Sequence, residues 1–412
     1  MVNNRSRPHK LGALASYFVV LVLVFTSLRG WVVLNLNAPT EVVYSFSSML
    51  IIALAMYGFN CRFRIKDSNL TLLRNLLLVN LLLGIYYVIG TKLLGGAIEV
   101  SIFYLYILPY IVFLFLRISA KKLHVGLFFI FVGISFSVID NFIISLTGAD
   151  GLAYMEEYNT KLRPLVFDAM SRTGAYLRVG GYTASYHDSA NILGMLGSYY
   201  YVKSIIDRSW LTIIIAMIAL GAMTFTQSAA NIILALFTCF MFTIYIAVKK
   251  PTVSTGILLL AIAVMVTFAI STFPELLVFS ARIDADGDWD NMNKNITWEI
   301  FLSPHFWFGH GSIVSSESVG TEVAFLAGIL QVGIVPACLL YWILIFPVYV
   351  FFARKSGSFA LLPYLAAIVF GFLSLTHYGS LFRVTNIAIF YAMYALFFIN
   401  VIADKESQLK IS

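Results

Sequence analysis

Apolar residues run almost without interruption along this chain, and polar residues gather in short connecting stretches and in two longer ones. A helix needs about 20 mainly apolar residues to cross the hydrocarbon core of a bilayer. Windows of that length predict about twelve spans, near 11–28, 42–59, 70–90, 98–116, 123–146, 186–206, 210–226, 228–248, 255–273, 322–352, 358–375 and 384–402. We therefore predict an all-α, polytopic membrane protein with one membrane domain over residues 1–412.

The two longer polar stretches, residues 147–181 and 274–320, are predicted to be loops on one side of the membrane. The first apolar stretch, from Leu11, has no small-residue cleavage site after it and continues into further spans. We interpret it as a retained helix and not as a signal peptide.

Composition supports the membrane assignment. The chain is 60% hydrophobic and 11% charged, with a mean hydropathy of +0.89, whereas soluble domains are about 45–50% apolar and about 25% charged. The net charge of +7 does not indicate nucleic-acid binding, because no compact basic domain is present to receive a duplex. The three cysteines lie in or beside apolar spans, which argues against disulfides and thiolate metal sites.

Lysine and arginine accumulate on the cytoplasmic side of membrane proteins. If the N-terminus is cytoplasmic, every inner segment carries at least two of them. These inner charges are Arg5, Arg7, Lys10, Arg62, Arg64, Lys66, Arg74, Arg117, Lys121, Lys122, Lys203, Arg208, Lys249, Lys250, Arg354, Lys355, Lys405 and Lys410. We therefore expect both termini to be cytoplasmic and both long loops to be extracytoplasmic.

Ionisable residues are scarce in the middle of the predicted spans. Asp140, Asp188, Glu322 and Arg383 all fall near outer ends. Ion-coupled transporters usually carry charged or broken-helix sites near the midplane of the membrane. The scarcity of such sites here counts against a secondary transporter.

The first group of candidate functional residues closes the first long loop. Arg172 and Arg178 precede the pair Gly180-Gly181, and a predicted helix with His187 and Asp188 in its first residues follows. Guanidinium groups bind phosphate bidentately, glycines allow close backbone approach, and a helix N-terminus offers unpaired N–H donors. This pattern predicts a phosphate cradle. The alternative is that the arginines reach lipid headgroups or pair with Glu156, Glu157 or Asp168.

The second group lies at the end of the second loop. His310 stands in a Gly-His-Gly turn, and Glu322 begins the next apolar stretch. Imidazole suits proton transfer near neutral pH, and partial desolvation would raise the pKa of a carboxyl group. Both are candidate general bases. The alternatives are a hydrogen-bonded turn histidine and an acid that complements a helix dipole.

The acidic stretch 284–290 does not follow the calcium-loop pattern, since Trp289 stands where that pattern needs glycine. We interpret it as a solvated loop and expect no metal site.

The order of short motifs resembles a known family. An Arg-x-x-Gly segment, Arg178 to Gly181, precedes a span, and a Thr-x-Thr-x-Ser turn ending at Ser228 joins two others. The segment 304–311 then leads to Glu322 and the run that follows it. Together these resemble the O-antigen polymerase/O-antigen ligase superfamily of bacterial envelope glycosyltransferases, over roughly residues 170–350.

The resemblance implies a metal- and cofactor-independent glycosyltransferase of the membrane-embedded C type in the bacterial inner membrane. Its donor would be an undecaprenyl-diphosphate-linked glycan on the extracytoplasmic side. Arginines of the outer loops would hold the diphosphate, Glu322 or His310 would serve as base, and His187 and Asp188 would lie at the edge of the substrate groove. The product would be O-antigen, capsular polysaccharide or exopolysaccharide, and a chain-length regulator and a flippase would be partners.

Two departures from the family pattern matter. The family often has Ser-Arg in the turn between spans, where this chain has Gln227-Ser228-Ala229, and Arg383 is the candidate replacement for the missing arginine. Ligases usually carry histidine where this chain has Glu322, which favours a polymerase. The alternatives are a ligase that transfers glycan to lipid A core or protein, and a glycan flippase.

Overall fold

The computed structural model describes residues 11–61, 67–93, 105–147, 151, 157, 161, 179–183, 185–226, 228–250, 329, 332–354, 358–376, 381 and 383–411. These residues form helices and turns and no strand, which confirms the prediction of an all-α chain. The elements are α1 (Ala13–Ser27), α2 (Arg29–Leu36), α3 (Thr40–Phe59), α4 (Ser68–Leu93), η2 (Leu108–Tyr110), α6 (Ile111–Phe115), α7 (Ala120–Ser145), α10 (Tyr186–Asp207), α11 (Trp210–Phe225), α12 (Ala229–Lys249), α20 (Ile334–Ala353), η5 (Phe359–Leu361), α21 (Leu362–Leu373), η6 (Ser374–Thr376) and α22 (Val384–Ile411).

Several of these helices can cross a membrane. Within the described ranges, seven are long and apolar enough, or eight if the bent pair α1–α2 counts as one span. The windows predicted at 98–116 and 210–226 contain shorter apolar helices, Leu105–Phe115 and Trp210–Phe225. The predicted span 255–273, the loop 274–320 and most of the loop 147–181 lie outside the described residues. The chain is therefore a multi-pass membrane protein.

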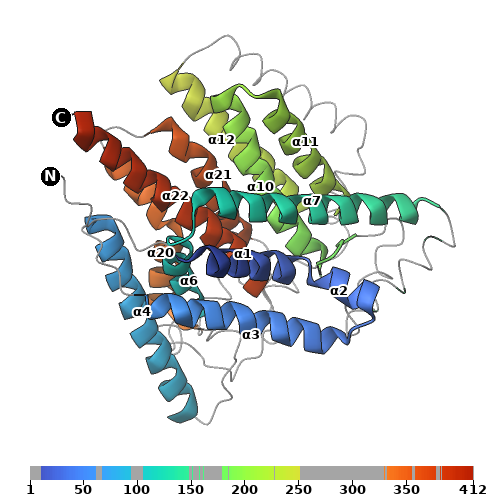
Figure 1. Cartoon of the computed structure of the whole chain (residues 1–412), viewed down its shortest axis with the longest axis horizontal. Helices are drawn as coiled ribbons and strands as arrows, with labels where there is room; N and C mark the ends of the chain where they lie inside the picture. Colours follow the sequence, from blue (N-terminus) through green and yellow to red (C-terminus); the bar gives the residue numbers. More distant parts are fainter. Residues whose placement is uncertain are drawn as a thin grey trace, which may run out of the picture.

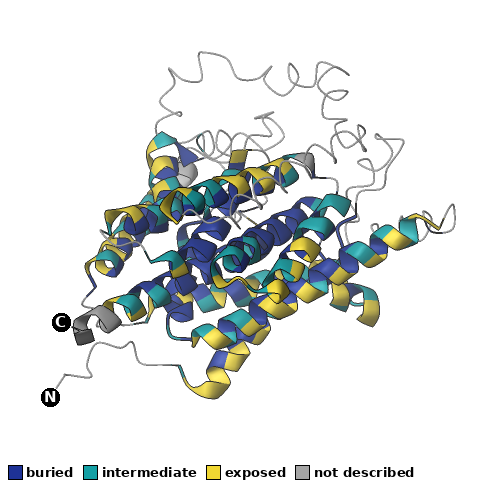
Figure 2. Ribbon diagram, turned by 90° about the horizontal axis from the view of Figure 1, so that it is seen from above, coloured by how far each residue is buried: buried dark blue, intermediate teal, exposed yellow. Residues whose placement is uncertain are grey.

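The helices pack as two groups that meet along α10 and α22. In Figure 1, α1, α3 and α7 run across the view, and α1 contacts both α3 and α7. In the second group, α10 contacts α11, α12, α21 and α22, and also reaches α7 of the first group. Figure 2 shows that the buried residues lie in the middle of this assembly, with exposed residues on the outer helices.

The central helix α10 is 22 residues long but is not among the helices that are apolar enough to span by composition alone. It carries buried polar residues, among them His187, Asp188, Asn191 and Ser198. Such side chains are costly against lipid, and they are tolerated where neighbouring helices surround them. The ring of contacts from α7, α11, α12, α21 and α22 therefore makes a polar helix possible here.

Glycine lets one of these neighbours approach closely. A Cβ added at Gly194 of α10 would overlap the ring of Phe370 in α21, and Phe370 is itself fully buried. Small residues at helix interfaces allow such close packing in membrane proteins.

One end of the bundle collects the beginning of α1 and the last turns of α22, and we call it the terminal end. The backbone N–H of Leu11 donates to the carbonyl of Arg117 at 3.1 Å. Lys405 Nζ lies 3.3 Å from Oδ2 of Asp67. These contacts place the predicted inner segments around residues 11, 67, 117 and 405 on one side.

The opposite end, which we call the site end, collects the predicted outer segments. The Thr385 hydroxyl donates to the carbonyl of Thr26 at 3.4 Å. The N–H of Gly30 donates to the carbonyl of Tyr182 at 3.0 Å. The described helices that these contacts join therefore alternate in direction between the two ends.

The site end contains a sharp bend in the chain. Helices α1 and α2 meet at an angle of 68° around Leu28, and α2 ends at Asn37, which has a left-handed φ of 47°. Asparagine tolerates this conformation at a helix C-terminus, and Pro39 then prevents the helix from continuing. The bend turns α2 away from the path of α1 and brings Arg29 to the end of the bundle.

We expect Gly194→Ala to destabilise the protein by about 1–3 kcal/mol, because the ring of Phe370 has to shift within a packed interior. Gly221→Ala is the matched control, since a Cβ there meets nothing within 4 Å. Unfolding temperatures in detergent measure both. An equal effect of the two substitutions would contradict the packing of α10 against α21.

The two ends also predict a labelling pattern. In a chain without native cysteines, single cysteines at Arg208 and Lys250 should react with a membrane-impermeant maleimide from one side of the membrane. Cysteines at Asn37 and Thr147 should react from the other side, because these exposed residues lie at the opposite ends of their helices. Labelling of all four from the same side would refute the arrangement.

Candidate functional site

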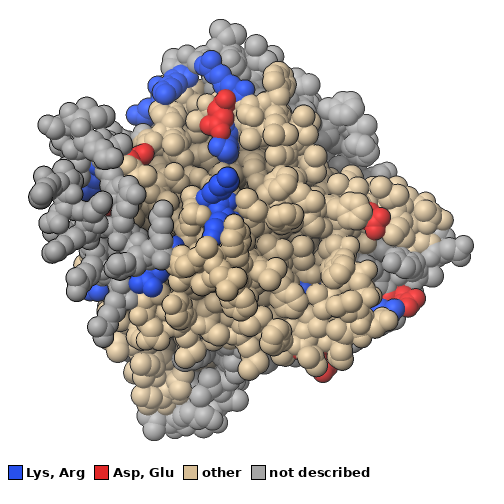
Figure 3. Space-filling view, in the orientation of Figure 1, with Lys and Arg blue, Asp and Glu red and all other residues tan. Residues whose placement is uncertain are grey.

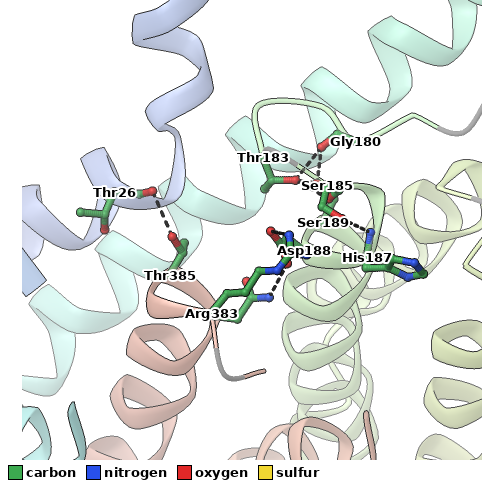
Figure 4. Close-up of polar contacts among 10 residues, drawn as sticks. Thr26, Gly180, Thr183, Ser185, His187, Asp188, Ser189, Arg383 and Thr385 are labelled. Atoms are coloured by element: carbon green, nitrogen blue, oxygen red, sulfur yellow. Dashed lines mark hydrogen bonds and ion pairs between the residues drawn. The ribbon is translucent and has the colours of Figure 1, made fainter. Parts of the chain in front are cut away.

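A tight turn at the site end, residues 179–183, precedes α10. Gly181 has a φ of +57°, which favours glycine. The turn packs on α7, where the Tyr182 N–H donates to Ser137 Oγ at 3.0 Å, and a Cβ at Gly181 would overlap that hydroxyl. The carbonyl of Gly180 accepts hydrogen bonds from Thr183 Oγ1 at 2.9 Å and from Ser189 Oγ (Figure 4). The glycine pair therefore fixes this turn against α7.

The N-terminus of α10 is capped from within the chain. The Ser185 side chain accepts from the N–H of His187 at 3.3 Å, and its carbonyl accepts from the N–H groups of Asp188 and Ser189. The prediction that these first-turn N–H groups are unpaired donors for phosphate is therefore wrong. The physical reason is that Ser185 is a good N-cap residue, which satisfies the helix donors itself.

Asp188 lies in the first turn of α10 and is 3% exposed. Its Oδ2 lies 2.8 Å from Nη1 of Arg383, and its Oδ1 accepts from Nδ2 of Asn386 at 3.2 Å. Figure 4 shows Arg383 reaching across from the start of α22 toward the carboxylate. The sequence placed Asp188 at the edge of a groove. The structure buries it in a contact between two helices, because a carboxylate there needs a cation and hydrogen-bond donors, and its place at a groove stays a prediction.

Arg383 belongs to the same contact but keeps part of its surface open. Its side chain is 41% exposed, whereas that of Asp188 is 5% exposed. The Asp188 carboxylate raises the pKa of Arg383, so this guanidinium is charged at any physiological pH. The suggestion that Arg383 supplies a functional arginine is consistent with this position beside the glycine turn.

His187 and Ser228 form a second contact at the site end. His187 Nδ1 lies 3.3 Å from Ser228 Oγ, which also accepts from Nδ2 of Asn231 at 3.0 Å. Ser228 precedes α12, so this contact joins the ends of α10 and α12. Both residues are largely buried, at 9% and 3% exposure. The structure thus brings together His187, which the resemblance places at a groove edge, and Ser228, which the sequence places in the turn between two spans.

Arg29 is a residue of this region that the sequence did not identify as functional. It begins α2 directly after the bend, and its guanidinium lies 4.0 Å from the centre of the Tyr44 ring. Asp188 and Arg383 both act on it electrostatically. In the sequence it is one arginine between apolar stretches, which is typical of a residue at a membrane boundary. Only the bend between α1 and α2 shows that Arg29 belongs to this region.

The other predicted site residues, Arg172, Arg178, Gln227, His310 and Glu322, lie outside the described residues. Of the acidic residues that could pair with Arg172 or Arg178, Glu157 is described. It pairs with Lys161 at 2.8 Å. This pair is exposed, so it contributes little to stability.

We expect Asp188→Ala to lower the free energy of unfolding by about 1–3 kcal/mol, because Arg383 and Asn386 lose their shared acceptor. Asp207→Ala is the matched control at the other end of α10. Its exposed pair with Lys203 should be worth less than about 0.5 kcal/mol. Thermal unfolding of the purified variants measures the difference, and a tolerated Asp188→Ala would show that the buried pair does not hold α10 to α22.

The described part of the site thus joins a glycine turn, a buried carboxylate, two arginines and a histidine–serine contact. Its chemistry suits an anion at the end of a helix bundle, since guanidinium groups in a partly desolvated setting bind anions strongly.

Compared with known proteins, the chain matches no protein-family model and no curated protein.

Proposed function

We propose that the protein is a membrane glycosyltransferase of the O-antigen polymerase kind. It would join undecaprenyl-diphosphate-linked repeat units into a polysaccharide at the extracytoplasmic face of the bacterial inner membrane. The observation that carries the proposal is the position of Arg383, a charged and partly exposed arginine beside the glycine turn at the site end. The motif order described above supports the same assignment.

Charge distribution supports the orientation. At the terminal end, the basic residues with described side chains are Arg74, Arg117, Lys121, Lys122, Lys203, Arg208, Lys249, Lys250, Arg354 and Lys405, and at the site end they are Arg29, Lys161 and Arg383. Figure 3 shows basic side chains gathered toward the ends of α10 and α12. Because cytoplasmic segments are enriched in lysine and arginine, the terminal end would be cytoplasmic and the site end extracytoplasmic.

The proposed reaction is a displacement at the anomeric carbon of the donor glycan. A hydroxyl group of the incoming lipid-linked unit forms the new glycosidic bond, the bond from the anomeric carbon to the diphosphate breaks, and undecaprenyl diphosphate leaves. Guanidinium groups of Arg172, Arg178 and Arg383 would stabilise the charge that develops on the leaving diphosphate. Glu322 or His310 would accept the proton of the attacking hydroxyl.

The proposed architecture follows the same reasoning. About twelve spans of the membrane-embedded C type would provide an apolar path for the polyprenyl chain, and the loops 147–181 and 274–320 would cover the glycan. A flippase that delivers the lipid-linked unit and a chain-length regulator would be partners. No nucleic acid and no cofactor enter this mechanism.

A ligase is the second candidate. Glu322 stands where ligases of the superfamily usually have histidine, and this favours the polymerase. A flippase is the third candidate. The scarcity of ionisable residues in the middle of the predicted spans argues against it.

We expect Arg178→Ala and Arg383→Gln to shorten the polymer made in a polymerase-null strain that carries this chain. Loss of one stabilising donor at a leaving group typically lowers the rate about 100-fold or more. Arg208→Gln is the control, because Arg208 is exposed at the terminal end. Gel ladders of the polysaccharide give chain lengths, with the amount of membrane protein measured in parallel.

Purified lipid-linked repeat units separate the three functions. Chain extension without any other acceptor supports the polymerase. Transfer only to lipid A core or protein identifies a ligase, and movement across vesicles without a new glycosidic bond identifies a flippase. Either of the last two outcomes refutes our proposal.

A further inference from the structure

A second arginine lies beside Arg383, and its position is fixed by the backbone. The N–H of Gly30, the residue after Arg29, donates to the carbonyl of Tyr182. A Cβ at Gly30 would overlap that carbonyl, so the contact requires glycine. Two residues before the bend, the carbonyl of Thr26 accepts from Thr385 of α22 (Figure 4). Arg29 is thus held between the glycine turn and the start of α22.

The side chain of Arg29 points into the same region. Its guanidinium stacks over the ring of Tyr44 in α3 at 4.0 Å, and its charge interacts with Asp188 and Arg383. Tyr44 also contributes to the electrostatic environment of Arg383. Helices α2, α3, α10 and α22 therefore all contribute to one cluster.

Among the described residues, the charges of this cluster do not balance. Two guanidinium groups, those of Arg29 and Arg383, interact with one carboxylate, that of Asp188. Both guanidinium groups carry a positive charge. Like charges held close together in a partly desolvated setting are unfavourable unless a further anion is present. The excess positive charge predicts that the cluster binds one.

Donors also remain for such an anion. A guanidinium has five N–H groups in a planar fork. The ion pair with Asp188 uses Nη1 of Arg383, while 41% of that side chain is exposed. Arg29 is half-buried and stacks its planar group on the ring of Tyr44. Two guanidinium forks in one cluster suit the several oxygens of a phosphate group, since guanidinium–phosphate pairs are commonly bidentate.

We propose that Arg29 and Arg383 together form a binding site for the phosphate or diphosphate group of an amphipathic phosphate ester, with Asp188 as the resident counter-ion that holds Arg383 in place. For the identity of the ester this inference rests on the proposed function. Arg29 thereby becomes a substrate-binding residue supplied by the first helix pair, far in the sequence from the two long loops. The phosphate ester can come from a polyprenyl diphosphate or from a phospholipid headgroup, and the experiment separates these sources.

The test measures binding of inorganic pyrophosphate to the purified full chain in phosphatidylcholine nanodiscs. We expect Arg29→Gln and Arg383→Gln each to weaken binding about tenfold or more, because each removes a charged hydrogen-bond donor. Arg208→Gln should bind like the wild type, since Arg208 lies at the other end of α10. Asp188→Asn should bind pyrophosphate more tightly, because it removes the competing anion and keeps a side-chain carbonyl for Arg383.

The arginine variants and Asp188→Asn are expected to change the pyrophosphate affinity in opposite directions. This difference distinguishes binding from a structural role. If the arginines only stabilise the fold, all three site variants lower the unfolding temperature and the Asp188→Asn variant does not gain affinity, which overturns the proposal. Absence of pyrophosphate binding by the wild type, or unchanged binding by Arg29→Gln, overturns it as well. Competition by added polyprenyl diphosphate but not by phosphatidylglycerol identifies the lipid-linked substrate, and competition by both identifies a general phospholipid site.

The readout does not depend on the glycosyl transfer. If pyrophosphate binds as expected but the chain makes no polymer from purified repeat units, the anion site stands and the polymerase proposal fails. If the chain makes polymer normally and Arg29→Gln changes neither binding nor chain length, the polymerase stands and the anion site fails.

Discussion

The buried carboxylate of Asp188 constrains the whole site end of the molecule. A carboxylate that is 5% exposed needs a cation and hydrogen-bond donors, and here they come from Arg383 and Asn386, nearly two hundred positions later in the chain. Removal of one partner from such a pair leaves a buried group unsatisfied, which costs more than the pair itself contributes. The first turn of α10 and the start of α22 are therefore held in one relative position, and the glycine turn and the α1–α2 bend pack against them.

This pair is possible because α10 is surrounded by protein. A helix with histidine, aspartate and asparagine in its first two turns would be unfavourable against lipid. Five helices contact α10, so its polar side chains meet one another and not hydrocarbon. These surrounding helices also lower the local dielectric constant, which strengthens the interactions between the charged side chains of the site. Fold and candidate chemistry thus depend on the same feature, a polar helix inside an apolar bundle.

The apolar pattern predicted most helices well where a span is apolar along its whole length. The window 123–146 matches Ala120–Ser145, and 358–375 matches η5, α21 and η6 together, because hydropathy sums reflect the transfer of whole segments into lipid. In the window 98–116 the described helix is Leu105–Phe115, and the residues before it lie outside the described part of the chain. The 68° bend was not foreseen, because Arg29 directly after Leu28 is equally typical of the plain end of a membrane span.

The sequence by itself determined that this is an all-helical, multi-pass membrane protein, and it named Asp188, His187, Ser228 and Arg383 as polar residues near helix ends. Composition and periodicity suffice for this, since the cost of polar groups in lipid acts on each segment separately. Only the tertiary structure decided which of these residues meet. Pairing of Asp188 with Arg383, and the approach of Arg29 through the bend, depend on helices that are distant in the chain but adjacent in the bundle, and hydropathy along one segment carries no information about its neighbours.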